Sequence, residues 1–238
     1  MFSPKELFDL SQFPYSAIFD GCDFAWDALP KIKEYIMHLF STVLQPGILT
    51  NIGTGAVIDG PVYIGKNTLV EPGAFIRGPA IIGENCEIRQ GAYIRGNLVM
   101  GDNSIVGHTT EVKNSIFLNH VHASHFAYIG DSILGNRVNL GAGTKLANLP
   151  MFSTKDPTTR KRPSLRFRFD NGEIDTGLSK IGAILGDDGQ TGCNSVTNPG
   201  CIIGPGTLVY PLVSLKKGYY SAHSILKLDQ RVEQEKRE

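Results

Sequence analysis

The chain has 238 residues, and its 41% hydrophobic content is typical of a globular protein. Its 23 basic and 23 acidic residues cancel, so no global attraction to nucleic acid or an anionic membrane is expected, and no apolar run approaches the ~18 residues of a membrane-spanning helix. The N-terminus lacks a signal-peptide pattern, and four cysteines without metal-ligand spacing favour a reducing compartment, which predicts a cytoplasmic protein.

The first 46 residues predict a helical cap. Apolar side chains recur at helical spacing at Ile32, Tyr35, Ile36 and Leu39, so one face of a helix is expected to be buried. Trp26 is expected to anchor this helix to the element that follows. A cap of this kind would cover apolar side chains and unpaired backbone at an open end of that element.

Residues 47–217 carry a repeat with a period of six. Twelve consecutive repeat positions are aliphatic or methionine: Ile52, Ile58, Ile64, Val70, Ile76, Ile82, Ile88, Ile94, Met100, Val106, Val112 and Leu118. A mostly small residue follows the first eleven of them four positions later, as at Ala56 and Ala74. An α-helix has a period of 3.6 and a strand a period of 2, so neither produces this pattern. The repeat predicts a parallel β-solenoid, in which three hexapeptides form a triangular coil with the aliphatic side chains inside.

The repeat is interrupted in two ways. It slips by one residue near the histidines and again soon after, and it resumes at Leu134. Between about 150 and 180 the sequence predicts an inserted loop, basic and proline-rich at first, followed by a β-hairpin that turns at residues 170–172. After the solenoid, residues 218–238 predict a C-terminal helix.

Three cations, Arg77, Arg95 and Lys113, are spaced by 18 residues. One coil of the solenoid has about this length, so their side chains should stack at ~4.8 Å spacing on one outward edge. Like charges this close disfavour each other unless something negative lies alongside. The ladder indicates either a site for a phosphate-bearing ligand or solvated cations paired with neighbours such as Glu71 or Glu111.

Three of the six histidines, at positions 120, 122 and 125, lie in the stretch NHVHASHFAYIGD. Histidine is a common metal ligand and also a base that titrates near neutral pH. Local spacing leaves three interpretations open: a metal site, a catalytic base, or histidines without a chemical role.

From about residue 47 onward the chain resembles the hexapeptide-repeat acyltransferases. The resemblance rests on the segments AYIRG, GHTTEVKNS, SHFAYIGDSILGNRVNLGAGTKLANL and TGLSKIGAILGDDGQTGCNSVTNPG. These look like the acetyltransferase half of the bifunctional N-acetylglucosamine-1-phosphate uridylyltransferase/glucosamine-1-phosphate acetyltransferase and, more closely, like archaeal-type sugar-phosphate nucleotidylyltransferases. The resemblance implies an all-β fold, a left-handed parallel β-helix, with acetyl-CoA as co-substrate. It also implies N-acetylation of an amino-sugar 1-phosphate, above all glucosamine 1-phosphate, in UDP-GlcNAc biosynthesis.

The same resemblance assigns the site residues. It makes His125 the general base that removes a proton from the attacking amine, and the backbone N–H of Ala142 the donor to the developing oxyanion. The implied sugar-phosphate contacts, with Arg77 added from the ladder, are Arg77, Arg95, Lys113, Tyr128, Asn139 and Lys180. The implied acetyl-CoA contacts are Asn148, Cys193, Pro211 and Lys227. Cys193 replaces a serine of the family and Lys227 replaces an arginine, and no metal is expected in this site.

Two other functions are compatible with the pattern. The family's N-terminal nucleotidyl-transfer domain has no counterpart in this sequence, so uridylyl transfer is not expected, and the prism could be a non-catalytic, trimerising partner of a separate nucleotidylyltransferase. The γ-class carbonic anhydrases share the prism and bind zinc through a pair of histidines five residues apart, as His120 and His125 are. Residue 84, where a third histidine would be expected, is Glu.

The spacing also predicts a homotrimer with its sites between subunits. His125 lies 12 residues beyond Lys113, which is two-thirds of a coil and about two faces away on the same prism. Since one prism can scarcely bring the base and the phosphate site together, neighbouring prisms packed around a threefold axis are expected to do so.

Overall fold

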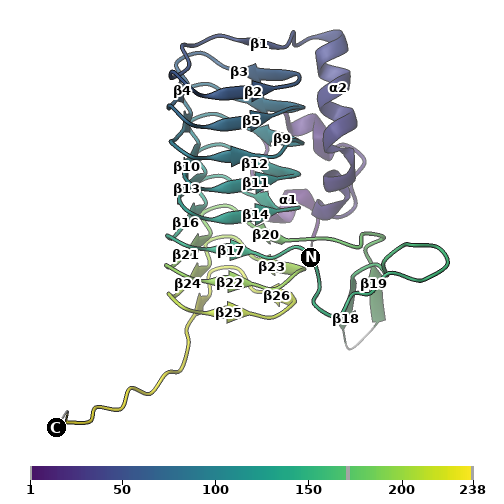
Figure 1. Ribbon diagram of the computed structural model, residues 1–238. Helices are drawn as coiled ribbons and strands as arrows, with labels where there is room; N and C mark the ends of the chain where they lie inside the picture. Colours follow the sequence, from purple (N-terminus) through teal and green to yellow (C-terminus); the bar gives the residue numbers. More distant parts are fainter. Residues whose placement is uncertain (1, 170–171, 237–238) are drawn as a thin grey trace.

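Stacked coils of short parallel strands form the body of the computed structural model, which describes residues 2–169 and 172–236 (Figure 1). The strands of the coils belong to three sheets that form the faces of a prism. The first sheet contains β1 (Gly47–Ile48), β3 (Val62–Ile64), β6 (Ala80–Ile82), β9 (Leu98–Met100), β12 (Ser115–Phe117), β15 (Ile133–Leu134), β20 (Ala183–Leu185), β23 (Cys201–Ile203) and β26 (Gly218–Tyr220). The second contains β4 (Leu69–Val70), β7 (Glu87–Ile88), β10 (Ile105–His108), β13 (His122–His125), β16 (Asn139–Leu140), β21 (Gln190–Thr191), β24 (Leu208–Val209) and β27 (Ile225–Leu226). The third contains β2 (Val57–Asp59), β5 (Phe75–Arg77), β8 (Tyr93–Ile94), β11 (Glu111–Lys113), β14 (Tyr128–Gly130), β17 (Lys145–Leu146), β22 (Val196–Thr197) and β25 (Ser214–Leu215).

The six-residue repeat places its aliphatic side chains inside the prism. Ile58, Ile76 and Ile94 pair in register on successive coils of the third sheet, 18 residues apart. Ile76 and Ile94 are completely buried in the core cluster. Burial of one apolar side chain per hexapeptide provides the hydrophobic stabilisation that stacks the coils. The predicted parallel β-helix is confirmed.

The coil loses one residue at two turns. Val112 and Phe117 are successive inward residues but lie five apart, with Asn114 (φ 47°) in the turn between them, and a second five-residue step contains Asp131 (φ 47°). Strands paired across these steps are therefore 17 residues apart instead of 18. The prediction that Leu118 points into the prism was wrong: Phe117 does so, and Leu118 packs outside under the N-terminal segment.

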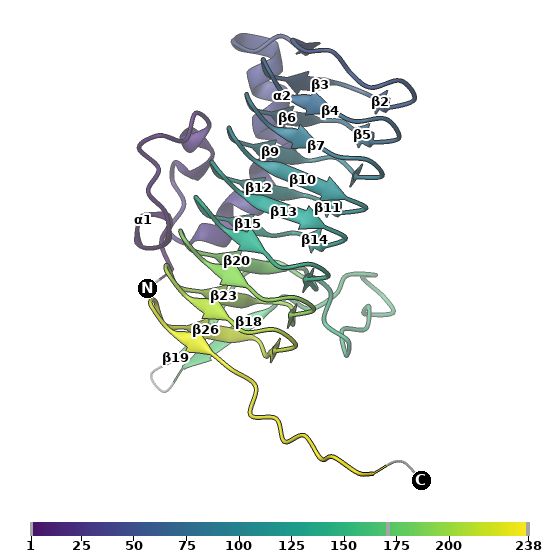
Figure 2. The same cartoon turned by 90° about the vertical axis from the view of Figure 1, so that its left-hand side faces the viewer.

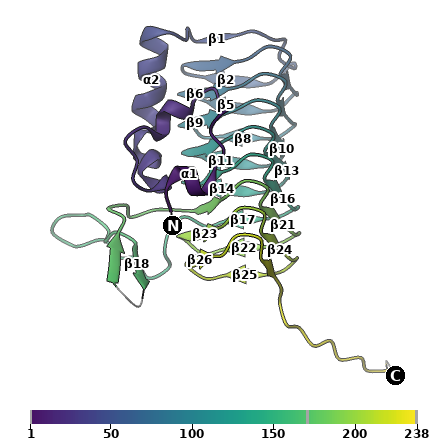
Figure 3. The ribbon, with the colours of Figure 1, turned by 180° about the vertical axis from the view of Figure 1, so that it is seen from behind.

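The N-terminal segment covers a flank of the prism. It contains α1 (Pro4–Leu7), the 3₁₀ helices η1 (Ser16–Phe19) and η2 (Ala25–Lys31), and α2 (Ile32–Thr42), and it runs beside the first sheet (Figures 1 and 3). As predicted, α2 buries Ile32 and Ile36, and Trp26 is buried next to it. The predicted position at an open end was wrong. The first sheet is apolar on both faces, as in the fully buried strand β6, so its outer face needs this cover.

The insertion and the C-terminus differ in how well they were predicted. The hairpin of β18 (Arg166–Phe169) and β19 (Gly172–Asp175) is confirmed, while Asp170 and Asn171 of its predicted turn lie outside the described residues. The predicted C-terminal helix was wrong. The six-residue step from Tyr220 to Leu226 continues the coil through β26 and β27, and residues 227–236 leave the stack without a helix (Figure 2).

Candidate functional site

One corner of the prism brings together the predicted base and most of the predicted acyl-donor contacts. The second sheet ends at this corner before the chain enters the third. Successive coils place one residue each on a column along the corner: Gln90, His108, His125, Ala142, Cys193 and Pro211. Backbone hydrogen bonds of 2.7–3.2 Å tie each carbonyl oxygen of the column, down to Cys193, to the next coil. Lys227 lies beside the lower end, with its Nζ 5.0 Å from the centroid of the Tyr210 ring.

The backbone N–H of Ala142 is not used by the ladder of hydrogen bonds. Gly141 N donates to Thr191 O at 2.8 Å and Gly143 N donates to His125 O at 3.1 Å, whereas the Ala142 N–H has no acceptor among the described residues. A donor in the middle of a rigid turn that is free to bind a ligand is what an oxyanion requires.

His108 lies beside His125 on the column, and sequence reasoning did not connect the two. Nδ1 of His108 is 2.9 Å from the carbonyl oxygen of Gln90. A carbonyl only accepts, so Nδ1 of His108 is the donor in this contact. Both imidazoles are exposed. The signal that could have revealed the pair is their 17-residue spacing, once the shortened coil is recognised.

The outer face of the third sheet carries the predicted basic ladder. Arg77 forms an ion pair with Asp59 (3.0 Å) and Arg95 with Glu111 (2.6 Å), so these two cations have carboxylate partners. Within the described residues Lys113 takes part in no ion pair. The half-buried Lys113 is therefore the cation of the ladder most available to an anionic ligand.

Tyr128 lies on the same face as the ladder, between it and the corner. Its strand neighbour is Glu111, and burial, reinforced by the charge of Glu111, raises the pKa of the Tyr128 hydroxyl. This hydroxyl donates to Oδ1 of Asn148 at 3.3 Å, and the Asn148 amide in turn donates to the Asp131 carboxylate. Asn148, predicted to contact the acyl donor, is thus buried at the far edge of the third sheet and orients Tyr128. It does not share a corner with His125.

Base and basic ladder lie on opposite edges of the third sheet. His125 ends β13 just before the chain enters this sheet, and Lys113 ends β11 where the chain leaves it. The base and the ladder were predicted to be two faces apart along the chain. Because the coil is triangular, two faces forward equal one face back, so the base and the ladder are separated by the width of one sheet.

Two residues that were predicted to contact the acceptor lie neither at the His125 corner nor on the basic ladder. Asn139 begins β16, at the edge of the second sheet opposite the His125 corner. Lys180 is exposed in the insertion and lines a hollow of ≈ 640 Å³ together with other cations of residues 155–162.

The sequence of the chain matches a known protein family. The model described as the GMPPB C-terminal domain matches residues 76–198, which is more than half of the chain. The chain belongs to this family. The matched residues include β13, the corner column down to Cys193, and the basic ladder from Arg77 onward.

The relatives of this chain include larger proteins. The bifunctional protein GlmU of Methanococcus aeolicus is 35% identical over 187 residues, 75% of this chain and 40% of that protein. The bifunctional sugar-1-phosphate nucleotidylyltransferase/acetyltransferase of Sulfurisphaera tokodaii is 34% identical over 116 residues, 48% of this chain and 27% of that protein. The chain therefore spans less than half of the length of these relatives.

A solved structure has the same fold as this chain. The UDP-N-acetylglucosamine acyltransferase of Francisella novicida superposes with a TM-score of 0.50 at 18% identity, covering 76% of this chain and 64% of that one. At this identity the similarity concerns the β-helix alone.

Neither a metal centre nor a membrane helix is found in residues 2–169 and 172–236. No three His, Cys, Asp or Glu side chains there lie close enough together to hold a metal ion. His120 sits in the turn before β13 and His125 at the end of that strand, so the pair that suggested zinc occupies opposite edges of the second sheet. No helix of this part of the chain is long and apolar enough to cross a membrane.

Proposed function

We propose that this protein is an acetyl-CoA-dependent N-acetyltransferase that acts on an amino-sugar 1-phosphate, with glucosamine 1-phosphate as the favoured acceptor. The observation that carries the proposal is the corner column, where the imidazole of His125 and the free N–H of Ala142 lie on adjacent coils. The acetyltransferase relatives support the same class of reaction.

In the proposed reaction His125 acts as the general base. It takes a proton from the amine as the nitrogen attacks the thioester carbonyl carbon, and the Ala142 N–H binds the oxygen on which negative charge develops. The tetrahedral intermediate then expels the thiolate of CoA, and His125 returns the proton to it. Cys193, Pro211 and Lys227, which follow on or beside the same column, are proposed to bind the acyl donor along the corner.

The acceptor phosphate is proposed to bind at the basic ladder. Lys113 supplies an ammonium that is unpaired among the described residues, and Arg95 can exchange its half-buried carboxylate partner for the stronger charge of a phosphate. Tyr128, fixed by Asn148, would orient the sugar between the ladder and the corner.

The test is a thiol-release assay with acetyl-CoA and a panel of glucosamine 1-phosphate, galactosamine 1-phosphate, glucosamine 6-phosphate, UDP-glucosamine and glucosamine. We expect kcat/KM for glucosamine 1-phosphate to exceed that for glucosamine by at least about tenfold, the effect of one charge-assisted phosphate contact. A folded protein that releases no thiol with any amino sugar would contradict acetyl transfer and favour the non-catalytic partner.

We further propose a homotrimer in which each site is completed by two subunits. The base and the ladder are one sheet apart on the same prism, and the N-terminal segment covers the first sheet, which leaves the second and third sheets free to pack. A threefold arrangement would set the His125 corner of one prism against the basic edge of the next.

Mixed trimers test this arrangement. Lys113→Ala and His125→Ala chains should each be inactive alone, but random co-assembly should restore roughly a quarter of the wild-type sites, because half of the basic edges and half of the bases are intact. Activity of co-refolded mixtures, with trimers verified by light scattering, measures this recovery. A fully active monomer, or verified mixed trimers without recovery, would contradict the shared site.

A further inference from the structure

The inserted segment surrounds a strongly basic hollow. Five cations line its ≈ 640 Å³: Lys155, Arg160, Lys161, Arg162 and Lys180. Within the described residues none of the five takes part in an ion pair, although arginines elsewhere in the chain commonly do. Five like charges around one hollow repel each other unless an anion lies among them.

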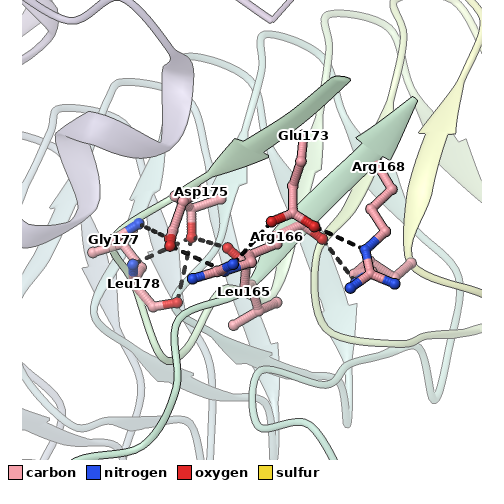
Figure 4. A network of polar contacts seen from close by, with 9 residues as sticks. Leu165, Arg166, Arg168, Glu173, Asp175, Gly177 and Leu178 are labelled. Atoms are coloured by element: carbon pink, nitrogen blue, oxygen red, sulfur yellow. Dashed lines mark hydrogen bonds and ion pairs between the residues drawn. The ribbon is translucent and has the colours of Figure 1, made fainter. Parts of the chain in front are cut away.

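The carboxylate in the wall of the hollow is already engaged. Asp175 accepts a hydrogen bond from Gly177 N (2.9 Å) and pairs with Arg166 Nε (3.1 Å), as Figure 4 shows. Hydrogen bonds from Ser164 and Gly177 hold the pKa of Asp175 below its ordinary value. The neighbouring Glu173 binds Arg166 and Arg168 instead. Asp175 and Glu173 thus form their ion pairs with Arg166 and Arg168, and neither forms one with the five cations.

The basic loop has a defined shape. Asp156 Oδ1 accepts from the backbone N–H groups of Thr158 (3.0 Å) and Thr159 (2.6 Å), and the Asp156 N–H donates to Lys161 O at 2.8 Å. Arg160 adopts a left-handed backbone (φ 58°) within this closed turn. The cations are thus presented by a folded loop, which reduces the entropy lost when an anion binds.

The hollow adjoins the proposed acceptor side of the prism. Two residues after Lys180, Gly182 N donates to Asp131 O at 2.7 Å, and Asp131 binds the Asn148 that orients Tyr128. Ser164 lines both this hollow and a larger one of ≈ 1010 Å³, whose wall includes the aromatic rings of Phe167 and Tyr219. The cations of the basic hollow therefore lie close to a second hollow that has aromatic residues in its lining.

We propose that the basic hollow binds the diphosphate group of a phosphorylated ligand. A single phosphate ester needs two or three charge-assisted hydrogen bonds, whereas five cations match the larger charge of a diphosphate. Two ligands could supply this group: a nucleoside-diphosphate amino sugar or the CoA of the acyl donor. Only this question of source rests on the proposed function.

Isothermal titration calorimetry with inorganic pyrophosphate, at low salt and without divalent cations, tests the site. The triple variant Arg160→Gln/Lys161→Gln/Arg162→Gln should bind pyrophosphate at least about tenfold more weakly than the wild type. The matched control Lys33→Gln/Lys66→Gln/Lys216→Gln removes three exposed cations elsewhere and should bind like the wild type. Thermal unfolding of both variants checks that they are folded. Equal weakening in both variants, or no binding to the wild type at millimolar pyrophosphate, would overturn the proposal.

Competition identifies the source of the diphosphate. Displacement of pyrophosphate by CoA assigns the hollow to the acyl donor, and displacement by UDP-glucosamine and UDP assigns it to a nucleotide-sugar acceptor in place of the sugar 1-phosphate. Displacement by neither would overturn a role in substrate binding. The outcome is independent of acetyl transfer, because calorimetry needs no turnover and His125→Ala should keep the pyrophosphate affinity of the wild type.

Discussion

Replacement of His125 by alanine is expected to lower kcat by about 10²–10⁴-fold, the usual contribution of a general base. The amine must lose its proton as it attacks the thioester, and without the imidazole only water can accept it. The fold should be unaffected, because the His125 side chain is exposed and its backbone bonds in β13 do not depend on the imidazole. Steady-state kinetics with glucosamine 1-phosphate and acetyl-CoA, beside circular dichroism of the variant, measure both effects.

His120→Ala is the matched control for this experiment, since it removes an exposed histidine five residues away at the opposite edge of the second sheet. It should retain the wild-type kcat. Inactivation by a zinc chelator, with His120→Ala as damaging as His125→Ala, would instead support the carbonic-anhydrase-like interpretation. Retention of activity in His125→Ala together with its loss in His108→Ala would move the base one coil up the column.

Replacement of Gly107 by alanine is expected to have the largest effect on stability. A Cβ atom at this position would lie 1.8 Å from the backbone oxygen of Ser124 on the next coil. The backbone of β13 cannot yield, because it is hydrogen-bonded to β10 on one side and β16 on the other. We expect a loss of more than about 3 kcal/mol, at the high end for a single substitution. Urea unfolding at fixed protein concentration measures it.

Gly47→Ala provides the comparison, because the nearest atom to a Cβ there is Gln45 O at 3.8 Å. Its free energy of unfolding should stay within about 0.5 kcal/mol of the wild-type value. If Gly107→Ala unfolded at the same urea concentration as Gly47→Ala, the close approach of β10 and β13 would be wrong.

The solenoid could be predicted because its six-residue repeat follows directly from the geometry of the coil. One inward side chain per hexapeptide fixes the face of every strand, so the stacking of Ile58, Ile76 and Ile94 follows from their spacing in the sequence. The place of the slip could not be predicted as well. Phe117 and Leu118 are both apolar, and only the turn at Asn114 decides which one enters the prism.

The positions of side chains outside the repeat were harder to predict. The prediction of a C-terminal helix was wrong because the solenoid step from Tyr220 to Leu226 lies in a stretch of mixed polarity, where the repeat is hard to recognise. Lys180 follows an insertion that no periodicity describes, so its position among the cations of the basic hollow depends on how the loop folds back. The partners of Asn148 depend on tertiary contacts across the shortened coil at Asp131.

The N-terminal segment packs against strands that the ribosome makes much later. The Trp26 ring stacks on that of Phe167 with 5.2 Å between ring centroids, and the Phe2 and Tyr219 rings meet edge to face with 5.4 Å between centroids. Each coil can form on its predecessor as it is synthesised, whereas these distant contacts carry a large loop-closure cost and form slowly. These N-terminal residues are therefore made before their partners and are among the last to reach their native contacts. Until then the apolar outer face of the first sheet and the Trp26 cluster are both exposed, and exposed apolar surface of this kind favours aggregation during folding.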